Sequence, residues 1–196
     1  MIDMESVLSR KKKIYTNKEL KDLGYSNYQI RQLVGQKVLI KLNRFNYENM
    51  EYEGEDSDYI YVYAYVPDGV ICLLSAASYY HLTTFRPESI DVAVHRKRNV
   101  TSLPDWPSLK LWYFAHNRLE DGVIEIDVCH QKVKIFDIEK TVIDIIYYRE
   151  TIGVEYTKEI LMNYLNRRDR DIQKLYTYAQ NLRCHHILRT YLEVLL

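Results

Sequence analysis

Three carboxylates in the second half of the chain could hold a metal ion. Glu125 and Asp127 alternate with apolar residues, so both project from one face of a predicted strand, and Asp91 lies on another strand. Such a cluster can bind Mg²⁺ for phosphoryl chemistry. The alternative is the solvent face of an antiparallel sheet, where polar residues alternate in the same way. Because no Walker-type glycine loop and no upstream Gly-Ser pair accompanies these residues, we favour the sheet surface and expect no enzymatic activity.

The six histidines and three cysteines also lack the spacing of metal ligands. No histidines follow an H-x-x-x-H pattern, and His185 and His186 are adjacent, so on a helix they point about 100° apart. Cys72, Cys129 and Cys184 are isolated, which argues against both a disulfide framework and a structural zinc site. We expect no metal and no cofactor.

The densest polar motif is residues 137–141 (Asp-Ile-Glu-Lys-Thr), followed by Asp144. We interpret it as the start of a helix, with Asp137 as the N-cap and Glu139 beside the positive end of the helix dipole. Asp144 is expected on the exposed side. We therefore expect the motif to stabilise the fold rather than to take part in catalysis.

Residues suited to nucleic-acid recognition lie near the N-terminus. Residues 16–19 (Thr-Asn-Lys-Glu) and 26–29 (Ser-Asn-Tyr-Gln) are two capping boxes, and Gly24 between them can end the first helix. In the second helix Ile30 and Leu33 begin a core-facing stripe. Its opposite face consists of Tyr28, Gln29, Arg31, Gln32, Gly35 and Gln36. Because this face has hydrogen-bonding groups, one cation and no carboxylate, it is suited to reading base edges in a major groove.

The following residues 39–47 predict a hairpin whose tip carries Lys41 and Arg44, placed to touch phosphates. The predicted DNA-binding residues are Lys18, Asn27, Tyr28, Arg31, Gln32, Gln36, Lys37, Lys41 and Arg44. Base reading is expected from Asn27, Tyr28, Arg31 and Gln32, and a phosphate contact from Lys37 at the helix end. The alternative is a small helical unit whose charges only solvate its surface. The basic run at residues 10–13 is a weaker candidate for DNA binding, because such runs usually only solvate the surface.

The distribution of charge divides the chain into a basic and an acidic part. Residues 1–50 contain ten Lys/Arg and five Asp/Glu, whereas the rest contains 17 and 22, so a net charge of +5 is joined to one of −5. An acidic joint at residues 51–58 separates a DNA-binding domain at residues 1–50 from a second domain at residues 59–196.

The second domain alternates strands and helices. Strands are predicted at residues 59–66, 89–95, 109–115, 123–129 and 132–136, with helices at 73–82, from 137 to Gly153, at 156–166 and at 171–196. The fold class is therefore α+β: a winged helix-turn-helix followed by a small mixed sheet with a helical C-terminus. Without a secretory signal or an apolar run of about eighteen residues, we expect a soluble, cytoplasmic protein with no membrane partner.

Three segments resemble the AbiEi antitoxins of bacterial abortive-infection toxin–antitoxin systems, which act in phage defence. They are residues 39–47, 69–77 and 136–144, although Phe45-Asn46 replaces the glycine that such proteins often have before the last tyrosine of the wing. The resemblance implies repression of the protein's own operon through inverted repeats in promoter DNA. It also implies neutralisation of a nucleotidyltransferase toxin, regarded as type IV because no stable toxin complex forms, with a second domain needed for antitoxin activity and cooperative repression.

Two other functions remain open. One is a winged-helix transcription factor whose second domain, in a chain with 19 tyrosines, binds a small ligand. The other is the metal-dependent enzyme that would use Asp91, Glu125 and Asp127.

Overall fold

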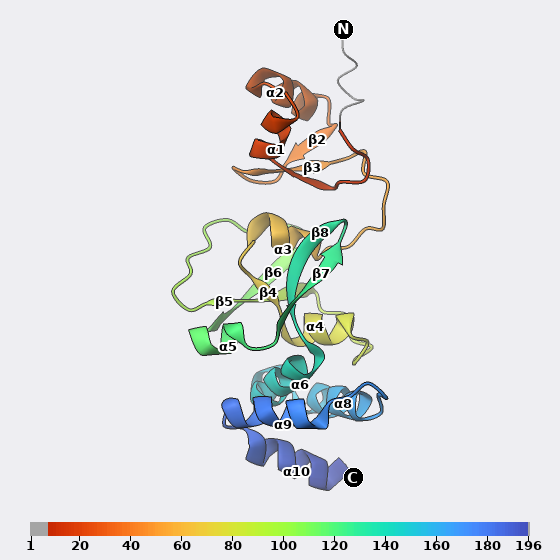
Figure 1. The fold of residues 1–196 in the computed structure, drawn as a ribbon, viewed down its shortest axis with the longest axis vertical. Coiled ribbons are helices and arrows are strands. Elements are labelled where there is room, and N and C mark those ends of the chain that lie inside the picture. The colour runs from red at the N-terminus through yellow and green to blue at the C-terminus, as the bar shows by residue number, and fades with distance from the viewer. Residues whose placement is uncertain (1–7, 196) are drawn as a thin grey trace. The chain divides into compact units, whose positions relative to one another are not determined.

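The computed structural model describes residues 8–195 and shows a mixed α+β protein (Figure 1). Residues 1–7, with the Asp3 and Glu5 carboxylates of the charge count, lie outside the described residues. The described part has ten helices and two sheets, and none of these helices is long and apolar enough to cross a membrane. The chain divides into two compact units. The first comprises the residues up to Pro67 with 100–107 and 126–133, and the second comprises 68–99, 108–125 and 134–196.

The first unit begins with a three-stranded sheet and two adjoining helices. β1 (Ile14–Thr16) and β2 (Leu39–Lys41) both pair antiparallel with β3 (Asn46–Asn49). α1 (Asn17–Asp22) and α2 (Asn27–Gly35) connect β1 to β2. The helices and the hairpin predicted here are therefore present. Their core consists of the buried side chains Leu8, Tyr15, Leu20, Tyr25, Ile30, Leu33, Val38, Leu39 and Tyr47.

Residues 59–66 form a helix, so the strand predicted from their alternating pattern is wrong. α3 spans Ile60–Tyr65 and belongs to the first compact unit, which thus extends past the acidic segment. The carbonyl oxygen of Ala64 accepts hydrogen bonds from Asn43 Nδ2 (2.8 Å) and Asn46 Nδ2 (2.6 Å) of the β2–β3 hairpin. Because these partners lie about twenty positions earlier in the chain, the local pattern did not reveal the helix.

The second sheet has the strand order β6-β5-β4-β8-β7. Its strands are β4 (Val70–Ile71), β5 (Ser89–His95), β6 (Ser108–Phe114), β7 (Val123–Val128) and β8 (Gln131–Phe136). β5 runs parallel to β6 and antiparallel to β4, and β4 runs parallel to β8. The predicted small mixed sheet is confirmed. In the turn between β7 and β8, Cys129 and His130 have φ of 52° and 62°, as a two-residue type I′ hairpin requires.

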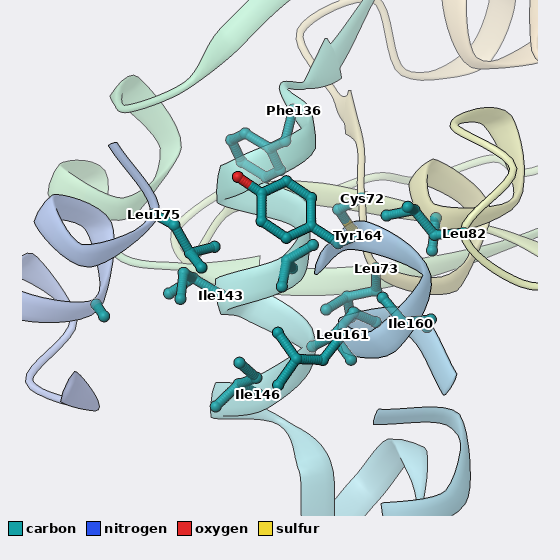
Figure 2. Packing of buried hydrophobic residues seen from close by; sticks show 14 of the residues in the cluster. Cys72, Leu73, Leu82, Phe136, Ile143, Ile146, Ile160, Leu161, Tyr164 and Leu175 are labelled. Carbon is teal, nitrogen blue, oxygen red and sulfur yellow. The ribbon is translucent and has the colours of Figure 1, made fainter. Parts of the chain in front are cut away.

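A group of helices completes the second unit. α6 (Ile138–Tyr147) packs against α4 (Leu73–Tyr79), α8 (Val154–Leu165), α9 (Ile172–Asn181) and α10 (His185–Leu195). Two short helices, α5 (His116–Glu120) and α7 (Arg149–Ile152), accompany them. Figure 2 shows apolar side chains of α4, α6, α8 and α9 meeting in this core, among them Leu73, Ile143, Ile160 and Leu175. The predicted helical C-terminus is confirmed.

The polar motif at the start of α6 is buried. Asp137 caps the helix as predicted, because its Oδ1 accepts the Lys140 N–H at 2.8 Å. Asp144, however, is fully buried, which corrects its predicted exposure. It pairs with Lys140 and with Arg118, whose Nη2 lies 2.8 Å from Asp144 Oδ1. Helices pack around α6 on several sides, so this polar position finds cations instead of water.

The other carboxylates of the motif connect α6 to two later helices. Tyr178 donates its hydroxyl to Asp137 Oδ2 at 2.8 Å, and Tyr164 donates to Glu139 Oε1 at 3.1 Å. Burial and the Glu139 carboxylate raise the pKa of Tyr164, so its hydroxyl stays protonated as a donor. Lys174 pairs with both carboxylates, at 3.1 and 3.2 Å. These contacts agree with a structural interpretation of the motif.

Candidate nucleic-acid interface

The candidate interface begins with the face of α2 that turns away from the core. Ser26 Oγ accepts the Gln29 N–H at 3.3 Å, and Gln29 Oε1 accepts the Ser26 N–H at 2.8 Å. The predicted capping box is therefore confirmed and fixes where the helix starts. Because Ile30 and Leu33 are buried, the 3.6-residue period of the helix turns the residues between them outward.

Four of the outward residues are held together by hydrogen bonds along the helix. Arg31 Nε donates to the carbonyl oxygen of Asn27 at 3.2 Å, and Gln32 Nε2 donates to the Tyr28 hydroxyl at 3.1 Å. Tyr28 is 65% exposed. These are the four residues predicted to read bases, and they lie on one helix face as two hydrogen-bonded pairs.

Nearly all of the predicted DNA-binding residues are exposed to solvent. Only Gln32 is half-buried, and the exposed ones are Lys18, Asn27, Tyr28, Arg31, Gln36, Lys37, Lys41 and Arg44. α2 contains no acidic residue. In the described part of the chain, none of the five cations in this set forms an ion pair. Their charges are thus available to an external anion.

The basic run at residues 10–13 has a different role. Arg10 pairs with Glu53 at 2.7 Å, Lys12 pairs with Glu19, and the buried Lys13 pairs with Asp56. Burial disfavours the charge on Lys13, but Asp56 outweighs this effect and the pKa of Lys13 is raised. Three of the four cations of this run are therefore paired within the fold, and Lys11 is the one that is exposed without an ion pair among the described residues.

Lys37 occupies a well-defined helix end. Its φ of 60° is left-handed, its N–H donates to Val34 O at 3.1 Å, and the Val38 N–H donates to Leu33 O at 3.0 Å. These two bonds form a Schellman motif, in which the left-handed residue is usually glycine. The exposed Lys37 side chain thus stands just beyond the C-terminus of α2, which agrees with a phosphate contact at the helix end.

The tip of the β2–β3 hairpin is fixed by side chains. Asn43 Oδ1 accepts the backbone N–H groups of Phe45 (2.9 Å) and Asn46 (3.0 Å). From α3, Tyr65 donates its hydroxyl to the carbonyl oxygen of Leu42 at 2.9 Å. The tip that carries Arg44 is consequently held on both sides, by its own turn and by a helix that the sequence interpretation missed.

Phe45 is the second feature of this tip that sequence reasoning missed. Its ring is 64% exposed and lies beside Arg44, with the guanidinium carbon 5.6 Å from the ring centroid. An aromatic residue directly after the cation of a predicted turn was the available signal.

The three carboxylates of the metal hypothesis are not brought together. β4 and β8 separate β5, which carries Asp91, from β7, which carries Glu125 and Asp127, and three strand spacings span about 14 Å. Asp91 is buried, accepts the Trp112 indole N–H at 2.8 Å, and has its pKa raised by burial. Glu125 and Asp127 are exposed, as on a solvent-facing sheet. Among the residues that the structure describes, no three His, Cys, Asp or Glu side chains are grouped to hold a metal ion.

Comparison with known proteins finds similarity to solved structures. No family model and no curated protein sequence matches the chain. The crystal structure of the RV2827C protein from Mycobacterium tuberculosis is similar to it, with a TM-score of 0.56 and 12% sequence identity. The match covers 97% of this chain and 79% of that one. At this identity, the similarity shows a related fold alone.

Proposed function

We propose that the first unit is a winged helix-turn-helix that binds double-stranded DNA, with α2 in the major groove and the β2–β3 hairpin as the wing. The observation that carries the proposal is the outward face of α2, which has no carboxylate and where hydrogen bonds along the helix hold the side chains of Arg31, Gln32 and Tyr28. Cations that form no ion pair within the described residues flank this face on α1, at the end of α2 and on the hairpin. Phosphates attract such cations, and base edges present matching donors and acceptors.

The proposed contacts divide into two kinds. Arg31 uses its Nε for the bond to Asn27, which leaves the two terminal amino groups of its guanidinium as a pair of donors for guanine O6 and N7. Asn27 and Gln32 have the side-chain amides that recognise adenine. Lys41 and Arg44 on the hairpin would neutralise phosphates, as Lys18, Gln36 and Lys37 would around the helices.

These two kinds of contact respond differently to substitution. Arg31→Ala or Gln32→Ala should cost about 1–3 kcal/mol on a preferred duplex and little on other sequences. Lys41→Ala or Arg44→Ala should weaken binding to all sequences and lower the salt slope by roughly one. Fluorescence anisotropy with preferred and scrambled duplexes over a range of NaCl concentrations measures both effects.

Arg10→Ala is the matched control, because Arg10 is already paired with Glu53, and it should leave binding unchanged. Binding that survives all four substitutions would show that α2 and the hairpin are not the interface.

We further propose that the protein is an antitoxin and autorepressor that counters a nucleotidyltransferase toxin. This proposal is supported by the resemblance to AbiEi antitoxins. Two of the three resembling segments correspond to β4 with α4 and to the end of β8 with α6, and α4 packs against α6 in the core of the second unit.

Co-expression with a neighbouring nucleotidyltransferase gene tests the antitoxin function. The full chain should restore growth and repress a reporter fused to its own promoter. An Arg31→Ala/Lys41→Ala variant should still restore growth while repression falls, because these residues belong to the first unit and its proposed DNA contacts. Failure of the full chain to restore growth would contradict the antitoxin proposal and leave DNA binding unaffected.

A further inference from the structure

An exposed aromatic ring stands at the tip of the β2–β3 hairpin, outside the hydrophobic core of the first unit. Phe45 is 64% exposed, whereas burying a phenylalanine would stabilise the protein by about 1.5–3 kcal/mol. The core of the first unit includes Tyr15, Tyr25 and Tyr47 but not Phe45. The ring is therefore free of the core and available to a binding partner.

The backbone beneath the ring is fixed on both sides. The Phe45 N–H donates to Asn43 Oδ1 at 2.9 Å, and the Phe45 carbonyl oxygen accepts the N–H of Asn17, the first residue of α1, at 2.7 Å. Asn43 is itself bonded to Ala64 of α3. Because this backbone is already fixed, it loses little conformational entropy when the ring binds a partner.

The charges around the ring favour a nucleic acid over an apolar protein pocket. The Arg44 guanidinium lies over the Phe45 ring, and Lys41 is exposed on the strand that leads into the tip. A protein pocket that enclosed the ring would also have to desolvate Arg44 without supplying an anion. A duplex supplies both a phosphate for the cation and base faces for the ring.

We propose that Phe45 is an apolar wedge that enters the minor groove and presses on a base step, with Arg44 at the groove edge. This inference rests on the proposed DNA-binding function. With α2 in the major groove, the narrower groove suits a tip that projects one ring and one guanidinium. Inserted apolar side chains partly unstack a step, and pyrimidine–purine steps yield most easily. Phe45 thus adds a preference for a deformable step to the sequence that α2 reads.

The test begins with the duplex that the full-length protein enriches most from a random-sequence pool. This duplex is synthesised with 2-aminopurine at successive adenines, because unstacking raises the fluorescence of this base. Wild-type protein should raise the signal roughly twofold at one step. Phe45→Ser should remove that rise and weaken binding about tenfold, and Phe45→Leu should keep part of both effects because it remains apolar.

Met50→Ala is the matched control. Met50 is 53% exposed and lies beyond the other end of β3, about 16 Å along the strand from Phe45. It should change neither the fluorescence nor the affinity.

The outcomes separate the two proposals. A duplex bound tightly with no fluorescence change at any position, or an unchanged rise with Phe45→Ser, would overturn the wedge and leave DNA binding intact. Enrichment of no duplex would overturn both.

Discussion

Asp144→Ala is expected to lower the free energy of unfolding by about 3–5 kcal/mol, the usual effect of removing one partner from a buried ion pair. The Asp144 side chain is fully buried, and so is its partner Lys140, at 1% exposure. The second partner, Arg118, is largely buried against the rings of Phe114, Tyr147 and Tyr148. Removing the carboxylate leaves the positive charge of Lys140 in the core without compensation.

The ion pair between Asp144 and Arg118 is a second reason to expect that Asp144→Ala destabilises the protein. Burial disfavours the charge of the guanidinium, but attraction from Asp144 outweighs it and the pKa of Arg118 is raised. Arg118 therefore remains charged in the folded protein and needs its counter-ion.

A urea titration of the full chain followed by circular dichroism measures this loss. Asp144→Asn should destabilise less than Asp144→Ala, because the amide oxygen can still accept one hydrogen bond. The control is Glu150→Ala, since Glu150 is 85% exposed in its pair with Arg149 and should matter by less than about 1 kcal/mol. If Asp144→Ala unfolded at the same urea concentration as Glu150→Ala, the buried cluster would contribute no stability.

Asn43→Ala is expected to destabilise the first unit by about 2–3 kcal/mol. The substitution removes three acceptor bonds within the hairpin tip, to the backbone N–H groups of Phe45 and Asn46 and to Asn46 Nδ2, and one donor bond to Ala64 of α3. Each such bond contributes about 0.5–1.5 kcal/mol. The tip would then be held less firmly, so the proposed DNA binding should weaken although Lys41 and Arg44 are unchanged.

Two further variants separate the parts of this effect. Asn43→Asp keeps the acceptor for the two N–H groups but not the donor to Ala64, so it should lose less stability than Asn43→Ala. Asn117→Ala replaces an exposed asparagine and should unfold like the wild type. Denaturation gives the stability and anisotropy gives the affinity. A wild-type midpoint for Asn43→Ala would mean that the Asn43 bonds do not hold the hairpin to α3.

Much of the candidate site could be predicted from the sequence because its signals are local. Ser26 and Gln29 are three residues apart, and this spacing alone determines a capping box and the start of α2. The helical period then separates the buried Ile30 and Leu33 from the outward Arg31. Four strands of the second sheet, β5 to β8, followed from alternation, whereas the two-residue β4 was missed.

Other features depended on partners far away in the chain. The tyrosines of residues 59–66 alternate like a strand, but the segment is a helix that contacts the hairpin through Asn43, Asn46 and Leu42. The sequence pattern predicted Asp144 on the surface, because the sequence of one helix does not reveal how many neighbouring helices will cover it. In both cases the deciding energy comes from contacts that form only when distant segments meet.

The sequence by itself therefore determined where the helices of the first unit begin and which side chains α2 turns outward, since capping and helical period act within a few residues. Only the tertiary structure decided which charges remain available. Arg10, Lys12 and Lys13 lie in the most basic run of the chain, yet they pair with Glu53, Glu19 and Asp56. The more dispersed cations of α1, α2 and the hairpin stay exposed and unpaired in the part of the chain that the structure describes. Ion pairing depends on distance in space, so a count of charges along the chain cannot reveal it.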